Sequence, residues 1–380
     1  MKGRSAYVAL LVAMVIVTVA KGGHELAVYP SYYPHEITIV TVAPQRAADL
    51  LREKKIHAYV GSKPRFTSAL PDFVRTIDSL GSFVTVRVNP QSALMRKGPF
   101  ACGVAAAVVR DMAGREAGLV FHPYPITPFH GDYLYHADLA DAAKARFSDT
   151  LDAAAMVSLA NLKVKGTSEL ARSLVRPGWL THAGTWDAEV ETVRADDLSA
   201  TSTVSLNGWL GPPWVRTGWY QAELLLANAA VGAARERAEA DFKRLTAGNF
   251  HGLVERINLE RDLMISLTAD CGKIVAGYTV KREYFSAEFS AGLENIGYDS
   301  LVGLNSPMFL RTVKLKAFPW NGWLMLGINT RPAAAWNPIA GMTDKFGRLV
   351  WYALGDPALL PSPYDSGWML NRVADVQPGQ

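Results

Sequence analysis

Short apolar strands and helices alternate along the first 150 residues, and this alternation constrains the fold more than any other feature of the sequence. The expected strands are rich in β-branched residues and bounded by Pro or Gly; they are 26–29, 37–42, 56–60, 83–88 and 119–121. The expected helices carry apolar residues at helical spacing; they are 44–54, 71–80, 100–112 and 137–147. Strand and helix in this order predict an α/β layer with a mostly parallel sheet.

Tryptophan and histidine are distributed unevenly along the chain. All ten tryptophans lie between Trp179 and Trp368, whereas six of the eight histidines lie before residue 137. This asymmetry indicates two units with different roles. We therefore expect an N-terminal α/β sheet lobe over residues 21–150 and a second, Trp-rich α+β lobe over residues 151–380.

The second lobe has a less regular pattern than the first. Helices are expected at 219–245 and 251–267, followed by a strand at 273–285. From residue 318 onward the chain is dense in Trp, Pro, Gly and Asn. We expect an irregular C-terminal segment there, held by aromatic packing.

The N-terminus has the layout of a secretory signal peptide. Lys2 and Arg4 precede an uncharged apolar run over residues 6–20, which ends in small residues at Thr18 and Ala20. A spanning helix needs about 20 apolar residues, and this run is shorter. We expect residues 1–20 to be a signal peptide cleaved after Ala20, and the alternative is a retained N-terminal membrane anchor. Either way, the remainder is exported to the periplasm or the extracellular space, and membrane contact requires that the segment be retained.

Charge and motifs exclude several common classes of protein. Lys and Arg number 39 against 35 for Asp and Glu, giving a net charge of +4, which gives no case for nucleic-acid binding. The sequence lacks G-x-x-x-x-G-K-[ST], H-E-x-x-H, G-x-S-x-G and an EF-hand loop. The usual NTPases, zinc proteases and α/β-hydrolases are therefore not first choices.

The chain has two cysteines, Cys102 and Cys271. In an oxidising compartment they can form one disulfide, and the alternative is a pair of buried thiols. There is no C-x-x-C-H motif, so no c-type haem is covalently attached to this chain.

The densest group of polar residues is the segment 122–138, between an expected strand and an expected helix. It holds three histidines, His122, His130 and His136, among stiffening prolines. Imidazoles with nearby carboxylates suit Zn, Fe or Cu, so the three histidines are a candidate metal site. The alternative is a rigid loop packed by Pro, Tyr and His, with Asp138 capping the following helix.

A second group is aromatic. Trp209, Trp214 and Trp219 stand five residues apart around a Gly-Pro-Pro turn. If exposed, they can stack on a flat ligand or form an interface. The interpretation that we favour is that they form the core of a domain with few leucine-rich helices.

The stretch 24–61 resembles the first lobe of periplasmic solute-binding proteins. It reads as a strand, an aromatic loop, a helix and then a short strand, 57–61, in the place of the family's D-A-x-x-G type strand. The resemblance implies a two-lobed receptor that closes on a small ligand.

Three functions follow from these observations. The first is an exported solute-binding or accessory protein without chemistry of its own. The second is a periplasmic metal-dependent enzyme or redox-complex subunit that uses the segment 122–138, which we call the histidine loop. The third is a structural subunit of an envelope membrane complex, held by an uncleaved N-terminal helix. The partner is then a small-molecule ligand or an envelope protein complex. The candidate ligand-binding residues are His122, Tyr124, His130, Asp132, Tyr133, His136, Trp209 and Trp214.

Overall fold

The structure is a computed structural model that describes residues 34–94, 101–115, 118–148, 159–182, 184–201, 213–318, 322–333, 344–354, 359–362 and 367–371. The expected signal peptide, the expected strand 26–29 and Trp209 lie outside the described residues. Within these ranges, no helix combines the length and apolar character needed to cross a membrane.

One mixed sheet runs through the molecule in the order β1-β10-β2-β7-β3-β6-β5, with β4 also paired to β7. Its strands are β1 (Glu36–Thr41), β2 (Ala58–Val60), β3 (Val74–Val88), β4 (Leu119–Phe121), β5 (Val164–Gly166), β6 (Ala188–Arg194), β7 (Lys273–Ser286) and β10 (Trp323–Ile328). The pairs β1–β10, β10–β2 and β5–β6 are parallel, whereas the pairs made by β3 and β7 are antiparallel. The expectation of a mostly parallel sheet was therefore wrong.

Helices and two small hairpins complete the fold. The helices are α2 (Pro44–Arg52), α3 (Ala101–Ala113), α4 (Ala137–Ser148), α6 (Glu169–Leu174), α7 (Ala195–Thr201), α8 (Gly218–Leu226), α9 (Gly232–Thr246), α10 (Gly252–Thr268), α11 (Pro307–Thr312) and α12 (Lys345–Leu354). Short 3-10 turns are η2 (Tyr133–Tyr135), η3 (Pro213–Arg216) and η4 (Ala227–Ala229). The small paired strands are β8 (Leu293–Glu294) with β9 (Lys314–Leu315), and β11 (Leu359–Pro361) with β12 (Trp368–Leu370).

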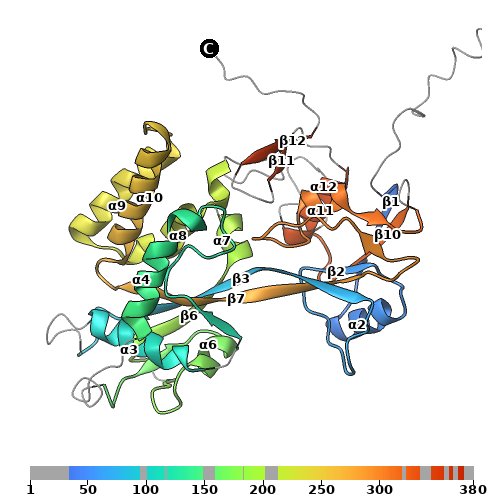
Figure 1. The fold of residues 1–380 in the computed structure, drawn as a ribbon. Coiled ribbons are helices and arrows are strands. Elements are labelled where there is room, and N and C mark those ends of the chain that lie inside the picture. Colours follow the sequence, from blue (N-terminus) through green and yellow to red (C-terminus); the bar gives the residue numbers. More distant parts are fainter. Residues whose placement is uncertain are drawn as a thin grey trace, which may run out of the picture.

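The molecule has two lobes joined by β3 and β7, which run side by side from one lobe into the other (Figure 1). We call the first the terminal lobe, because β1, α2, β2, β10, α11 and α12 come from both ends of the chain. The second is the middle lobe, and it contains α3 to α10. Separate apolar cores fill them: Leu324, Leu326 and Phe309 belong to the terminal-lobe core, and Val86 and Val108 belong to the middle-lobe core.

The expected two-lobed mixture of α/β and α+β structure is confirmed, but the lobes are not consecutive in sequence. The expected boundary near residue 150 falls inside the middle lobe, which holds elements from Ala101 to Thr268. The Trp-rich tail is more regular than expected, because it supplies β10 and α12 to the terminal lobe.

The expected helix at 71–80 is instead the first half of β3. Val74, Ile77 and Leu80 are buried at three-residue intervals, which imitates a helical stripe. The three side chains do not share one face of the strand: Val74, Ile77 and Leu80 enter three different apolar clusters, so both faces of β3 are buried. The register with β7 then shifts after Leu80, at a bulge. Gly81 lies in this bulge, where a Cβ would come within 2.6 Å of Thr279 Oγ1, so it marks a close approach of chains and not a helix stop.

The expected long helix at 219–245 is two helices, α8 and α9. Val231 adopts extended backbone between them, and its N–H donates to Asp270 Oδ2 at 3.3 Å. Because the chain bends there, α9 can pack against α10 instead of continuing α8. The other major expected helices and strand β7 agree with the structure within two residues at each end.

Cys102 of α3 and Cys271, just before β7, form a disulfide with a Cα–Cα distance of 5.0 Å. The bridge closes a loop of sequence separation 169 and ties α3 to the sheet of the middle lobe.

Candidate functional site

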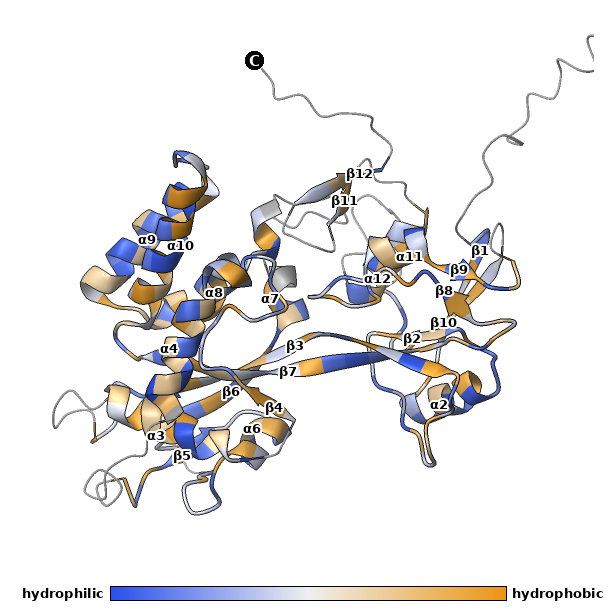
Figure 2. Cartoon of the chain, viewed as in Figure 1, coloured by the Kyte–Doolittle hydropathy of each residue, from blue (hydrophilic) through white to orange (hydrophobic). Residues whose placement is uncertain are grey.

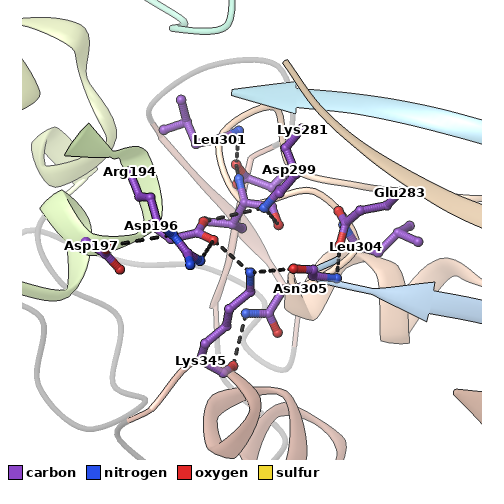
Figure 3. A network of polar contacts seen from close by, with 12 residues as sticks. Arg194, Asp196, Asp197, Lys281, Glu283, Asp299, Leu301, Leu304, Asn305 and Lys345 are labelled. Atoms are coloured by element: carbon purple, nitrogen blue, oxygen red, sulfur yellow. Dashed lines mark hydrogen bonds and ion pairs between the residues drawn. The ribbon is translucent and has the colours of Figure 1, made fainter. Parts of the chain in front are cut away.

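An ion pair joins the two lobes where they face each other. Asp196 lies in the first turn of α7 in the middle lobe, and Lys345 begins α12 in the terminal lobe. Asp196 Oδ2 and Lys345 Nζ are 2.8 Å apart, and their side chains are only 14% and 19% exposed (Figure 3). The pair therefore fixes the relative position of α7 and α12.

Further cations surround the Asp196 carboxylate. Lys281, on β7 between the lobes, places Nζ 3.4 Å from Asp196 Oδ1 and donates to Val302 O at 3.0 Å. Arg194 lies 3.4 Å from Asp196 Oδ2, and Lys345 Nζ also donates to Gly61 O at 3.2 Å. Figure 2 shows a hydrophilic stretch of β7 between the lobes. One carboxylate thus faces three cations.

The charged groups of this cluster change one another's pKa values. Burial alone would raise the pKa of Asp196, but attraction to Lys281 and Lys345 outweighs it and lowers that pKa below its usual value. Burial lowers the pKa of the Lys345 ammonium, and attraction to Asp196 only partly offsets this. Asp196 is therefore ionised at neutral pH.

Glu283, fully buried on β7, holds the surrounding loops in place. Its carboxylate accepts hydrogen bonds from Gly61 N and from Leu304 N, the latter at 2.8 Å. Gly303 has φ +69° and packs so closely that a Cβ there would lie 1.8 Å from Glu283 Oε2. Only glycine fits this position without displacing the carboxylate.

The segment 299–304 is a further connection between the lobes. Leu301 packs into the middle-lobe core and Leu304 into the terminal-lobe core. Asp299 anchors the segment: it pairs with Arg216 and accepts from Leu301 N at 2.8 Å. The ion cluster therefore lies where β3, β7 and this segment cross, which is where any change in lobe orientation must occur.

The side chains of this cluster are carboxylates, ammonium groups and guanidinium groups. The arrangement is suited to recognising charge on a ligand.

The histidine loop lies inside the middle lobe, and the expected site of His122, His130 and His136 around one metal is not formed. His122 Nε2 is bonded to Ile126 O at 2.9 Å. His130 Nδ1 accepts from Thr127 N at 2.9 Å, and its Nε2 donates to Gln221 Oε1 at 3.2 Å. Burial lowers the pKa of both rings, so they are neutral and committed to local hydrogen bonds.

The other residues expected to bind ligand also contribute to packing. Asp132 is buried and accepts from Gly218 N at 2.9 Å and from Trp219 N at 3.2 Å, so it caps α8 from outside. Tyr124 is buried in the same core, and the Tyr133 ring lies 5.8 Å from His122. A role of these residues in binding a ligand remains a prediction.

Trp214 is half-buried within an aromatic cluster. Its ring lies 4.8 Å from Tyr220 and 6.2 Å from the buried Trp219. Trp219 in turn contacts Phe242 of α9 at 5.9 Å. The cluster packs α8 against α9, in agreement with the core interpretation of the tryptophans.

Sequence reasoning missed the cluster between the lobes, because Asp196 and Lys345 are 149 residues apart. One signal was present: Lys281, Arg282 and Glu283 interrupt an apolar strand. Strand alternation puts Lys281 and Glu283 on one face and Arg282 on the other, where it pairs with Asp78 at 2.7 Å. A charged pair on the inner face of a buried strand indicates a candidate functional site better than the number of histidines does.

No family model matches the sequence, and no curated protein matches it either. Among solved structures, the chain is similar to Haemophilus influenzae OppA in complex with RPPGFSPFR, with 13% identity and a TM-score of 0.42 over 70% of this chain and 55% of that one. It is also similar to the periplasmic binding protein DppA of Helicobacter pylori in complex with the peptide STSA, with 11% identity and a TM-score of 0.39 over 72% and 56%.

A third similar structure is the oligopeptide-binding protein AppA of Bacillus subtilis in complex with a nonapeptide, with 12% identity and a TM-score of 0.39 over 72% of this chain and 59% of that one. The chain thus spans 55 to 59% of the length of these three structures. The two-lobed α/β arrangement expected from the resemblance of residues 24–61 is present in the structure itself (Figure 1).

Proposed function

We propose that the chain is an exported solute-binding protein whose lobes close on a small zwitterion, such as a short peptide, at the Asp196–Lys345 pair. The observation that carries the proposal is that the two lobes meet through opposite charges, a carboxylate from α7 and an ammonium group from α12. These two groups are complementary to the two ends of a zwitterion.

In the closed arrangement, the opposite charges of Asp196 and Lys345 pair with each other across the lobes. When the lobes separate, this ion pair breaks and both side chains are hydrated. A ligand ammonium group can then take the place of Lys345 on Asp196, and a ligand carboxylate can take the place of Asp196 on Lys345 and Lys281. Exchange of one charged partner for another avoids leaving a desolvated charge unpaired, which would be costly.

Export is supported by the sequence and by the disulfide. Residues 1–20 have the pattern of a signal peptide, and the Cys102–Cys271 bridge suits an oxidising compartment. In this proposal the protein carries no chemistry of its own and delivers its ligand to an envelope transport partner.

Binding of alanine di- and tripeptides, measured by calorimetry, tests the proposal. The free peptides are compared with the same peptides acetylated at the N-terminus or amidated at the C-terminus. We expect the free peptides to bind and each blocked form to bind at least about tenfold more weakly, since each loses one charged hydrogen bond. Equal binding of free and blocked peptides, or no binding of any of them, would contradict the proposal.

Asp197 provides the matched control on the protein. It neighbours Asp196 on the same helix, but its side chain is 66% exposed and 3.7 Å from Arg194. Asp196→Asn should weaken peptide binding about tenfold or more, whereas Asp197→Asn should leave it within about twofold.

A further inference from the structure

Three buried side chains of the middle lobe converge where the histidine loop packs against α10. Asp132 and His136 flank η2, and Glu260 lies on the facing helix α10. One ligand atom from each of the three lies within 4.8 Å of the other two. His136 is 0% exposed and Glu260 is 1% exposed, so water cannot satisfy them from bulk solvent.

Two of these ligand atoms have no hydrogen-bond partner. His136 Nε2 and Glu260 Oε2 are both unpaired, although they face each other at 3.6 Å. A hydrogen bond between them would be about 2.7–3.0 Å long. Two ligands held about 2.1 Å from one tetrahedral ion lie about 3.4 Å apart, which is close to the separation in the structure.

The ring of His136 is oriented by its other nitrogen. His136 Nδ1 is bonded to the Tyr124 hydroxyl at 2.9 Å. The phenol oxygen can accept a hydrogen bond from Nδ1–H. With the proton on Nδ1, Nε2 presents its lone pair to Glu260, which is how outer partners orient metal-binding histidines.

The charges of Asp132 and Glu260 also favour the binding of a cation. Asp132 accepts from the backbone N–H groups of Gly218 and Trp219 and keeps oxygen lone pairs for a further contact. Glu260 has a cationic neighbour, Arg256, whose Nε lies 3.3 Å from Glu260 Oε1, on the oxygen that does not face His136. Two buried carboxylates beside one guanidinium leave negative charge uncompensated in a site of low polarity.

We propose that Asp132, His136 and Glu260 bind one divalent cation of the zinc class. One imidazole and two carboxylates form a donor set that zinc accepts, and the fourth position is left for a water or a second carboxylate oxygen. Because the group is buried, the ion has a structural role: it ties η2 to α10 and binds as the middle lobe folds. The site is separate from the ion cluster between the lobes and does not depend on the proposed ligand.

Metal analysis of the mature protein tests the site. The chain is stripped with EDTA, exposed to Zn²⁺ and desalted, and zinc per chain is measured together with the midpoint of thermal unfolding. We expect about one zinc per chain and a higher midpoint than in the stripped protein. Replacement by Co²⁺ should give the intense visible absorption of a four-coordinate site with nitrogen and oxygen ligands.

Variants assign the ligands. His136→Gln and Glu260→Gln should each lower zinc affinity by about tenfold or more. Glu255→Gln, which makes the same change at a half-exposed position of the same helix where the side chain pairs with Arg244, should leave the affinity unchanged. If a ligand variant fails to fold, the zinc stoichiometry and the cobalt spectrum of the wild-type protein still test whether the metal site exists. Wild-type protein with less than about 0.1 zinc per chain, or equal affinity in the ligand variants and in Glu255→Gln, would overturn the proposal.

Discussion

Replacing Gly303 by alanine should destabilise the junction between the lobes more than any comparable glycine substitution in an open turn. Gly303 has φ +69°, a conformation that costs an L-residue about 1–2 kcal/mol. A Cβ there would also lie 1.8 Å from Glu283 Oε2, so the carboxylate must move. Glu283 then loses the hydrogen bond from Leu304 N, worth about 1.5–3 kcal/mol for a charged acceptor. The expected loss is about 2.5–5 kcal/mol.

Gly248→Ala is the matched control, because Gly248 has φ +67° and nothing within 4 Å of a Cβ. It should show only the backbone cost, about 1–2 kcal/mol. Urea unfolding of both variants, followed by tryptophan fluorescence, gives the comparison. If the two variants were destabilised equally, the contact between Gly303 and Glu283 would not hold the junction, and the reasoning would be refuted.

Three further predictions concern the middle lobe. Replacing Cys102 and Cys271 together by serine should lower the free energy of unfolding by about 2–5 kcal/mol, measured by urea unfolding under non-reducing conditions. Burial raises the pKa of Glu223 to about 7, so the folded state holds a proton that the unfolded state has released above pH about 4.5. Stability should therefore fall as pH rises from about 4.5 to 7, and Glu223→Gln should remove this fall in unfolding midpoints measured across that range. Trp219→Ala should cost about 3–5 kcal/mol in urea unfolding, and Trp214→Ala less, because only Trp219 is fully within the core.

Elements whose sequence pattern agrees with their packing could be predicted from the sequence alone. α2 begins at Pro44 and buries Ala47, Ala48 and Leu51 on one face, as its apolar stripe indicates. β3 could not be predicted in the same way, since Val74, Ile77 and Leu80 are buried in three different clusters on both faces of the strand and so show a helical spacing. Only the pairing with β7 identifies that segment as a strand.

The histidine loop shows why residue type is a weaker guide than position. His122 and His130 look equivalent to His136 in sequence, yet His122 is hydrogen bonded to Ile126 and His130 to Gln221 of α8, whereas His136 keeps a free nitrogen facing a carboxylate. That carboxylate, Glu260, is 124 residues away in an expected helix and gave no local signal. Sequence could place the loop but not its partner.

The cluster between the lobes could not be predicted from the sequence, because of the topology of the chain. The terminal lobe is made from both ends of the chain, so Lys345 returns to face Asp196 only after the middle lobe is complete. The boundary drawn from composition leaves Asp196 and Lys345 in one expected lobe, whereas the structure puts them in different lobes. The long strands β3 and β7, which run from one lobe into the other, decide the architecture.

The distance between the lobes in solution tests the central claim most directly. Spin labels at Val254 of α10 and Leu354 of α12, both exposed, report on the middle and terminal lobes. The distribution of distances between the labels is measured by pulsed electron–electron double resonance, without ligand and with saturating trialanine, for the wild type and for Asp196→Asn. We predict that peptide narrows the wild-type distribution to a single distance, set by a peptide lying between Asp196 and Lys345, and that Asp196→Asn at the same peptide concentration does not give this distance. A wild-type distribution that peptide leaves unchanged would contradict closure of the lobes on a zwitterion.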